Sequence, residues 1–406
     1  MKIRRTHSLI GVFIVITFLS LESFKPAKNA LLPVEEIKPY IGFLKTQHST
    51  AEDYIISLFD KNDVVILCER LHPELTQYDL VLNVCRNPKF IKNVGNVIIE
   101  VCTRSQEKTI YQLLHASEIN ESKTKQQILS ICKNSSVHPF WENYNFPYLL
   151  NGLYGINKKL NADKKINLYP SDLPLDWFAM DSTRYSKLEK SFDNRDKTIA
   201  DYIISKFDSI RCSKGARKKV LIIMNYRHAF GNKFSYPNNV KPNNVGRFLF
   251  DKYNGKIANV LINTYAITSA RSDNDVSMTA IQEGKWDASF KLLNIENKGF
   301  DFNNSPFGND YFDLWPFTKH NFKYADVFNG FVFYKPLDKN RLVVGIPDII
   351  DSSFCKELNR RYQLIKKVTG RDYHISESII WSWNKIEEKN PLYTDSIKFK
   401  IDKWIK

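Results

Sequence analysis

Residues 63–72 read DVVILCERLH, an apolar run that ends at Glu69, with His72 three residues later. A run without polar alternation is typical of a strand buried on both faces of a parallel sheet. Four further runs have the same character, and we predict strands for them as well. They are NVGNVIIE at 93–100, KINLYPSD at 165–172, KKVLIIMN at 218–225 and IANVLINTY at 257–265.

Segments with apolar residues at every third or fourth position separate these runs, as expected of amphipathic helices. They cover residues 73–87, 105–117 and 194–210, and Pro73 is expected to begin the first of them. The alternation predicts an α/β domain over residues 51–268, with a mostly parallel central sheet flanked by helices.

Residues 137–159 break this alternation and are rich in aromatic side chains. We predict a loop and a helix here, and insertions of this kind often wall a pocket. The aromatic residues could belong to the core or could line an apolar pocket for haem or another hydrophobic ligand. They are Phe140, Trp141, Tyr144, Phe146 and Tyr148.

The amino-acid composition changes near Ser269, where a linker rich in Ser, Asp and Asn begins. Residues 270–406 are therefore predicted to form a C-terminal α+β subdomain that extends the α/β domain. Within it, residues 330–347 read as two strands around a polar turn. Whether these strands join the central sheet stays open from the sequence.

The N-terminus carries a basic segment followed by the apolar run Leu9–Leu21. This run is too short for a comfortable bilayer span of about 20 residues, and the pattern is that of an export signal. Residues 1–30 are predicted to be a signal peptide or an uncleaved signal anchor, which could attach the protein to a membrane. The protein is therefore expected to be exported, as a periplasmic, membrane-anchored or extracellular protein.

The net charge is +15, and residues 1–30 contribute five basic residues and one acidic residue, so the remainder keeps a charge of +11. Its lysines lie in scattered groups without a nucleic-acid motif, and no nucleic-acid partner is expected. The six cysteines include no C-x-x-C pair, which excludes zinc fingers and thioredoxin-like motifs. Serine-hydrolase elbows, H-E-x-x-H helices, P-loops and G-x-G-x-x-G motifs are also absent.

Polar residues follow the apolar runs where a parallel sheet ends, which is the edge where ligands bind in such folds. Glu69, His72, Glu100 and His228 are expected to converge there. A carboxylate can orient an imidazole, which can then take a proton from water near neutral pH. The same residue types could instead hold a divalent metal ion. Taken singly, Glu100 could pair with Arg104, and His228 could be a core histidine.

Several short motifs occur in this order along residues 55–265, and together they resemble the erythromycin esterase / haem-binding-uptake ChaN-like / Tiki superfamily. Cys68 stands where the family motif usually has glycine, Pro73 follows His72, and Tyr226 and Arg227 precede His228. The matching residues are Glu69-x-x-His72, the strand-ending Glu100, Asp172, Arg195-Asp196 and His228-Ala229.

The resemblance implies more than one activity. Members hydrolyse a macrolide ester with histidine-activated water, act as metal-dependent proteases, or bind haem. On this chain His72 would be the water-activating base or a metal ligand, and Glu69 and Glu100 would orient it or ligate the metal. His228 would be a second base, an oxyanion donor or a ligand. The residues expected to support the site or bind substrate are Asp172, Arg195, Asp196 and Arg227.

We therefore predict an exported hydrolase that acts on an ester or amide in a small-molecule or peptide substrate, with water activated by the Glu/His site. A divalent metal ion could assist. The alternative is an uptake protein that binds haem or another hydrophobic ligand, and a structural surface protein comes third. Cys68 is expected to be a buried thiol, because no nearby motif marks it as an activated nucleophile.

Overall fold

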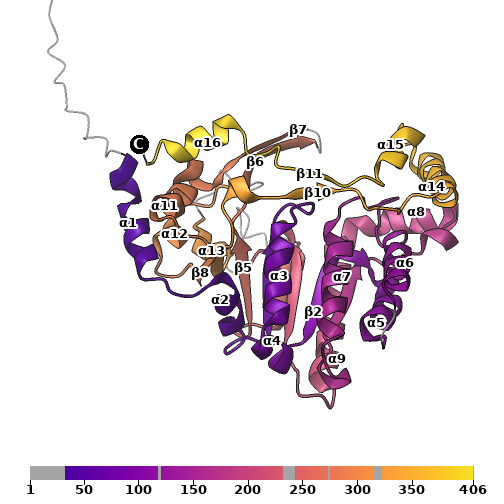
Figure 1. Ribbon diagram of the computed structural model, residues 1–406, viewed down its shortest axis with the longest axis horizontal. Coiled ribbons are helices and arrows are strands. Elements are labelled where there is room, and N and C mark those ends of the chain that lie inside the picture. Colours follow the sequence, from indigo (N-terminus) through magenta and orange to yellow (C-terminus); the bar gives the residue numbers. More distant parts are fainter. Residues whose placement is uncertain (1–32, 118–119, 232–242, 273–274, 315–321, 406) are drawn as a thin grey trace, which may run out of the picture.

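The computed structural model describes residues 33–405 except 118–119, 232–242, 273–274 and 315–321 (Figure 1). The predicted export signal at 1–30 lies outside the described residues. Among the helices that are described, none is long and apolar enough to cross a membrane.

A seven-stranded sheet with the order β3-β2-β4-β1-β5-β9-β8 forms the centre of the molecule. All neighbouring strands are parallel except β8 and β9, so the predicted mostly parallel sheet is confirmed. The runs around Glu69, Glu100 and Met224 form the neighbours β1, β2 and β4, as predicted. In sheet order the strands span Asn167–Asp172, Asn96–Thr103, Val220–Asn225, Val64–Glu69, Ile257–Ile262, Gly330–Phe333 and Lys298–Asp301.

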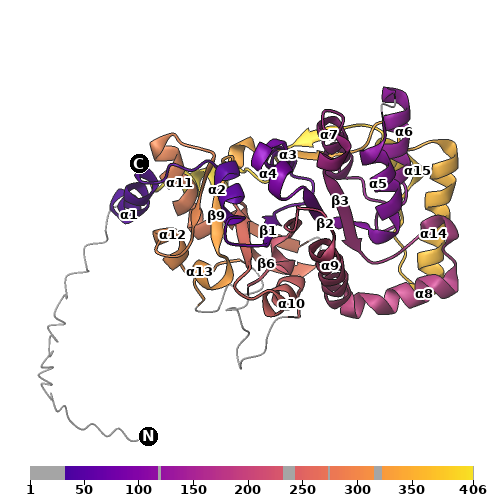
Figure 2. The ribbon, with the colours of Figure 1, turned by 90° about the horizontal axis from the view of Figure 1, so that it is seen from below.

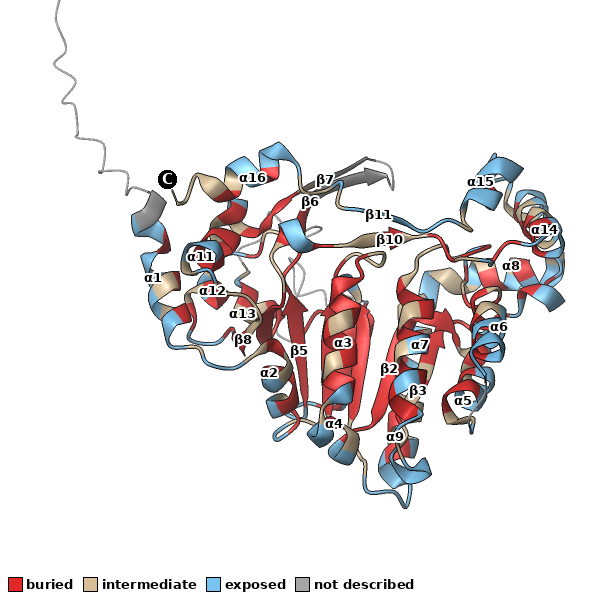
Figure 3. Ribbon diagram, viewed as in Figure 1, coloured by how far each residue is buried: buried red, intermediate tan, exposed pale blue. Residues whose placement is uncertain are grey.

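Helices cover both faces of this sheet (Figure 2). Successive side chains of a strand point to opposite faces, so Val65 and Leu67 join one core, and Val64 and Ile66 join the other. Every residue of β1, β2, β4 and β5 is buried, which explains why their sequences are mostly apolar without polar alternation (Figure 3).

The first core is closed by α2 to α7, which span Ala51–Leu58, Thr76–Arg86, Pro88–Asn93, Glu107–His115, Glu121–Cys132 and Asn145–Asn157. The second core is closed by α1 and α9 to α13, which span Pro33–Lys45, Arg195–Cys212, Val245–Lys252, Lys285–Leu293, Pro306–Asn309 and Tyr324–Val327. Figure 2 shows α3, α5, α6 and α7 on one side of the strands, and α9 and α10 on the other.

The C-terminal third adds strands to the same sheet, which answers the question that the sequence left open. β9 pairs with β5 and β8, whereas β10 (Leu342–Val344) pairs with β11 (Glu387–Lys389). The two strands predicted in 330–347 therefore exist but do not pair with each other. The remaining elements are β6 (Tyr265–Ser272), β7 (Asp275–Ala280), α8 (Ser182–Ser191), α14 (Ser352–Thr369), α15 (Glu377–Ser382) and α16 (Asp395–Asp402).

The scattered basic groups have a structural role at the amino edge of the sheet, where helices end. Lys165 Nζ donates to the carbonyls of His115 and Ala116 at the end of α5, at 3.2 and 3.0 Å. Lys218 and Lys219 donate in the same way to carbonyls that follow α9 and α2. Cations at helix C-termini satisfy free carbonyls and oppose the helix dipole, so these lysines stabilise the fold.

Candidate functional site

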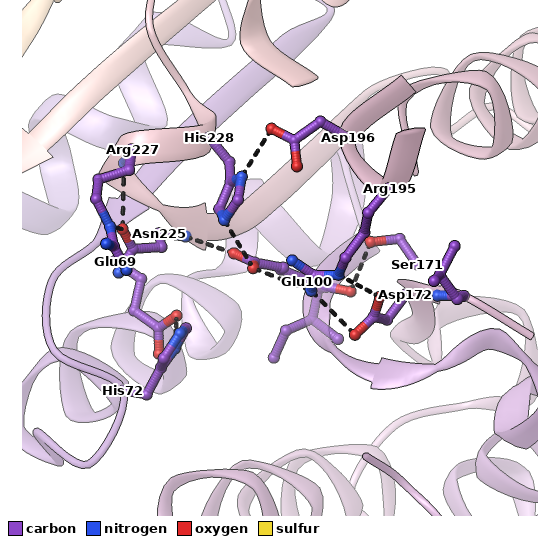
Figure 4. A network of polar contacts seen from close by, with 12 residues as sticks. Glu69, His72, Glu100, Ser171, Asp172, Arg195, Asp196, Asn225, Arg227 and His228 are labelled. Carbon is purple, nitrogen blue, oxygen red and sulfur yellow. Dashed lines mark hydrogen bonds and ion pairs between the residues drawn. The ribbon is translucent and has the colours of Figure 1, made fainter. Parts of the chain in front are cut away.

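The carboxyl edge of the sheet carries a pocket of about 370 Å³. Glu69 ends β1, Glu100 lies in β2, Asp172 ends β3, and the turn of residues 226–228 follows β4. Figure 4 shows how these side chains point toward one another. The predicted residues that line the pocket are His72, Glu100, Asp172, Arg195, Arg227 and His228. Glu69 lies behind His72 and Asp196 lies behind His228, each as the hydrogen-bond partner of that histidine.

His72 is held at one nitrogen and open at the other. Its Nδ1 lies 2.9 Å from Glu69 Oε2, and the Glu69 side chain is only 1% exposed. No described residue pairs with Nε2, and the ring lines the pocket with its edge toward Trp141, at a centroid distance of 5.1 Å. Burial lowers the pKa of His72, but the charge and hydrogen bond of Glu69 outweigh it, so that the pKa is raised above 6.5.

Two buried residues orient Glu69 from behind. The Tyr78 hydroxyl donates to Glu69 Oε1 and accepts a hydrogen bond of 2.8 Å from Asn145 Nδ2. Burial and the charge of Glu69 keep the pKa of Tyr78 well above its usual value, so the hydroxyl stays protonated and can donate. Each Glu69 carboxylate oxygen therefore accepts a hydrogen bond, Oε1 from Tyr78 and Oε2 from His72.

The turn between Glu69 and α3 is fixed by a buried ion pair. Arg70 Nε lies 2.9 Å from Glu74 Oε2, and the two side chains are 1% and 0% exposed. Glu74 also accepts from the backbone N–H groups of Thr76 and Gln77, at 2.9 and 3.1 Å. This carboxylate caps the helix, which begins at Thr76 and not at Pro73 as predicted.

A segment distant in sequence closes the same edge. β10 bridges Glu74 through Leu342 and bridges Asn143 through Val344. Val343 N donates to the Pro73 carbonyl at 2.8 Å, and the Val343 carbonyl accepts from Tyr144 at 3.1 Å. The His72 turn and the Trp141 loop are therefore held together by one strand.

Glu100 is the central carboxylate of the network. Its Oε2 accepts from Asn225 N at 2.8 Å, and its Oε1 lies 3.4 Å from both Arg195 Nη2 and His228 Nε2. Burial would raise the pKa of Glu100, but His228, Arg195 and His72 together lower it to about 2. Glu100 is thus anionic, and it pairs with Arg195 rather than with the predicted neighbour Arg104.

Arg195 also holds Asp172 in a two-point pair, with Nε–Oδ1 at 2.8 Å and Nη2–Oδ2 at 3.0 Å. This geometry is the strong bidentate form of the arginine–carboxylate contact.

β2 carries an irregularity between Ile99 and Thr103, and Cys102 within it has a φ of 95°. The strand therefore continues past Glu100 instead of ending there.

His228 faces carboxylates on both sides. Its Nδ1 lies 2.8 Å from Asp196 Oδ2 in the first turn of α9, and its Nε2 faces Glu100. Burial lowers the pKa of His228, but the two carboxylates outweigh it and raise the pKa above 6.5. An imidazole between two acceptors is best satisfied when both nitrogens carry protons. His228 is therefore a positioned cation rather than a free base.

Arg227 provides an exposed cation at the pocket. Its backbone N–H and Nε donate to Asn225 Oδ1 at 3.1 and 3.3 Å, and Asn225 Nδ2 donates to the Arg70 carbonyl at 2.8 Å. Among the described residues nothing accepts a hydrogen bond from its two terminal nitrogens. These N–H groups are available to a ligand.

Divalent metal ions do not fit this arrangement. Across the described parts of the chain, no group of three or more His, Cys, Asp or Glu side chains is placed to hold a metal ion. Of the two predicted histidine ligands, His228 is held by carboxylates at both nitrogens, and His72 alone keeps a nitrogen free of any described partner. The Arg195 guanidinium already supplies positive charge beside Glu100, where a bound cation would be repelled.

The predicted residues lie together at one edge of the sheet, but the sequence did not predict several of their partners. Arg70, Glu74, Tyr78 and Asn145 were not predicted, although a charged pair next to an apolar strand was a usable signal. In the aromatic insertion, Trp141 lines the pocket, whereas Phe140 and Phe146 are buried in the core. α7 supplies the predicted helix of this insertion.

Cys68 is fully buried in β1, and burial raises the pKa of its thiol. We expect iodoacetamide to modify the exposed Cys212 in the native protein and to leave Cys68 unmodified until the chain is unfolded. Peptide mass spectrometry after timed labelling measures both sites in one sample. Labelling of Cys68 as fast as Cys212 would mean that this thiol is accessible and reactive.

No protein-family model matches the chain, and no curated protein does. Among solved structures, a mutant erythromycin esterase EreC in its open conformation is 9% identical, with 73% of this chain and 94% of that chain covered and a TM-score of 0.45. A Bacillus cereus protein is 10% identical over 73% and 96% of the two chains, with a TM-score of 0.43. Haem-bound ChaN of Campylobacter jejuni is 14% identical over 55% and 87%, with a TM-score of 0.31.

Proposed function

We propose that this protein is an exported hydrolase that cleaves an ester or amide bond in a small-molecule substrate with water activated by His72. The observation that supports this proposal is the His72–Glu69 pair. The contact of 2.9 Å between His72 Nδ1 and Glu69 leaves His72 Nε2 facing a pocket of about 370 Å³. That volume lies within the range of about 300 to 1,000 Å³ usual for small-molecule sites.

The reaction follows from the tautomer that Glu69 imposes. Because Glu69 accepts the Nδ1 proton, neutral His72 has its lone pair on Nε2, where it can accept a proton from water. The hydroxide equivalent adds to the substrate carbonyl carbon, and the carbonyl oxygen becomes an oxyanion. When the bond to the leaving group breaks, the proton on His72 Nε2 passes to the leaving oxygen or nitrogen.

Arg227 offers free N–H groups to the oxyanion, and His228 adds a positive charge nearby. The terminal N–H groups of Arg227 have no acceptor among the described residues, and His228 is cationic between Asp196 and Glu100. Donors that are already oriented before the reaction are the most effective stabilisers of developing charge. Arg195 and Asp172 act as positioning residues, because they fix Glu100 and through it His228.

The proposal is tested by incubating the purified full chain with chromogenic esters and anilides of varied acyl groups, with and without a chelator. We expect ester turnover that survives chelation. A parallel titration with haemin distinguishes the alternative, since His72 Nε2 could also serve as an axial ligand. A shifted Soret band that His72→Asn abolishes, together with no turnover of any ester, would replace hydrolysis by haem binding.

The pH profile should reflect the raised pKa values of both histidines. His72 must be neutral to act as a base, so kcat/KM should fall as the pH falls through its raised pKa, with a midpoint above 6.5. His228 must be protonated to stabilise the oxyanion by its charge, so the rate should fall again as the pH rises through its own raised pKa. Both limbs are macroscopic properties of the coupled site.

Substituting Arg227 provides a second test of the pH profile, because the positive charge of Arg227 lowers the pKa of His72. The Arg227→Gln variant should therefore shift the acidic limb to higher pH, in addition to lowering the rate. An acidic limb centred below 6.5 would contradict the assignment of His72 as the base.

Export is part of the proposal and rests on the basic segment and apolar run of residues 1–30. A fusion of residues 1–35 to a reporter should carry the reporter out of the cytoplasm. Replacing Val15 and Ile16 by aspartate should abolish export, because two charges interrupt the apolar run. A wholly cytoplasmic reporter in the unaltered fusion would contradict this localisation.

A further inference from the structure

A second cavity, of about 410 Å³, lies between α11, the turn after β9 and α16. It shares no lining residue with the His72 pocket. Figure 1 shows α11 and α16 at the end of the sheet that carries β8, whereas β2 lies toward the other end, where the strand order also places β3. The cavity is therefore independent of the proposed hydrolytic site.

One wall of this cavity contains Asp287, a residue of α11 that is only 3% exposed. Its Oδ1 accepts from Asn263 Nδ2 at 3.1 Å, but its buried Oδ2 has no hydrogen-bond partner among the described residues. Asn263 Oδ1, which is also buried, has none either. Two buried acceptor oxygens without donors are unusual in folded proteins, because each loses its hydrogen bonds to water.

No described cation neutralises Asp287. Arg70 is the nearby guanidinium, but it is engaged by Glu74 at 2.9 Å and by the Asn263 carbonyl. Burial raises the pKa of Asp287 to about 7, because it outweighs the lowering effects of Asn263, the Leu337 backbone and Arg70. A ligand that brings positive charge and N–H donors to this carboxylate would supply both missing interactions.

The lysines at the rim cannot fill this role, because they are paired elsewhere. Lys291 Nζ lies 2.7 Å from Asp402, and Lys339 Nζ lies 2.8 Å from Glu296. The rest of the lining is largely apolar, which disfavours a hydrated inorganic ion and favours an organic group. The apolar wall residues are Phe290, Ile295, Phe333, Leu337, Tyr393 and Ile401.

We propose that this cavity is a second binding site, for a primary amine with an apolar body whose ammonium group pairs with Asp287. An ammonium carries three N–H donors, and one of them can supply the hydrogen bond that Asp287 Oδ2 lacks. The aromatic and aliphatic walls bury the remainder of the ligand. Phe290 and Phe333 stack on each other at a centroid distance of 3.8 Å within the apolar wall.

The test uses the full chain, 2-phenylethylammonium as the probe and 2-phenylethanol as its neutral analogue, with binding measured by titration calorimetry. The amine should bind at least about tenfold more tightly than the alcohol, since a charge-assisted hydrogen bond replaces a neutral one. Asp287→Asn keeps the shape of the side chain and should remove this preference. Asp338→Asn changes an exposed carboxylate of the same cavity and should alter amine binding by less than about twofold.

A second variant keeps the carboxylate and fills the space. Ile295→Trp places a large side chain in the cavity from a half-buried position, and it should abolish binding of both probes while circular dichroism shows an unchanged fold. Equal affinity for amine and alcohol, or unchanged amine binding in Asp287→Asn, would overturn the proposal. So would displacement of the amine by potassium but not by a neutral solute, because the site would then be an inorganic cation site.

Discussion

Replacing His72 by asparagine is expected to lower kcat for ester hydrolysis by about three orders of magnitude, because His72 is the imidazole that Glu69 orients in this pocket with its lone pair on Nε2. Asparagine keeps a planar polar group that can still accept a hydrogen bond, but it cannot take a proton near neutral pH. The His72 side chain is 26% exposed, so little core packing is lost. Initial rates at the pH optimum and the thermal unfolding midpoint measure the two effects separately.

The matched control is His374→Asn, which changes a histidine that is 84% exposed and lies in the segment between α14 and α15. Its kcat should change by less than about twofold, as is usual for surface substitutions. If His72→Asn kept more than about a tenth of the activity with an unchanged unfolding midpoint, His72 would not be the general base.

The central strands were predictable because their burial is uniform. A strand covered by helices on both faces needs apolar residues along its length, and residues 64–68 and 220–224 meet that demand. The run at 93–100 was placed too early, since β2 begins after Gly95, whose φ of +58° makes a turn, and continues to Thr103. The sequence suggested that Glu100 ends its strand. The strand instead continues and buries Glu100, whose charge is compensated by Arg195, almost a hundred positions later.

The site was predictable in outline for a topological reason. Parallel strands deliver their carboxyl ends to one edge, so residues that follow apolar runs meet there whatever the order of the strands. The partners that hold these residues come from elsewhere. Asn145 reaches Glu69 through Tyr78, and β10 clamps the His72 turn from 270 positions away in the sequence. Contacts of this kind leave no local pattern, and one sequence does not reveal them.

Replacing Glu69 by glutamine is expected to cost about two to four orders of magnitude in kcat, although the side chain keeps its size and its hydrogen-bonding capacity. In the native site both carboxylate oxygens accept, one from Tyr78 and one from His72 Nδ1. A glutamine has one accepting oxygen and one donating nitrogen. Because the Tyr78 hydroxyl already accepts from Asn145, its proton needs the glutamine oxygen, and the glutamine nitrogen is left facing His72. His72 Nδ1 must then accept, which moves the ring proton to Nε2 and removes the lone pair that would activate water.

If Glu69 acts by controlling the His72 tautomer, a second substitution should restore activity, which simple loss of charge does not predict. In the Glu69→Gln/Tyr78→Phe double variant the hydroxyl that fixes the amide is gone, so the amide can rotate and present its oxygen to Nδ1. The double variant should therefore be about tenfold more active than Glu69→Gln alone, whereas Tyr78→Phe by itself should lower the native rate by less than about tenfold. The four rates form a double-mutant cycle, and folding of each protein is checked by its thermal unfolding midpoint. A double variant no more active than Glu69→Gln would show that Glu69 acts through its charge, by stabilising the protonated imidazole. Recovery in the double variant would instead identify control of the His72 tautomer as the role of the Glu69–Tyr78–Asn145 chain.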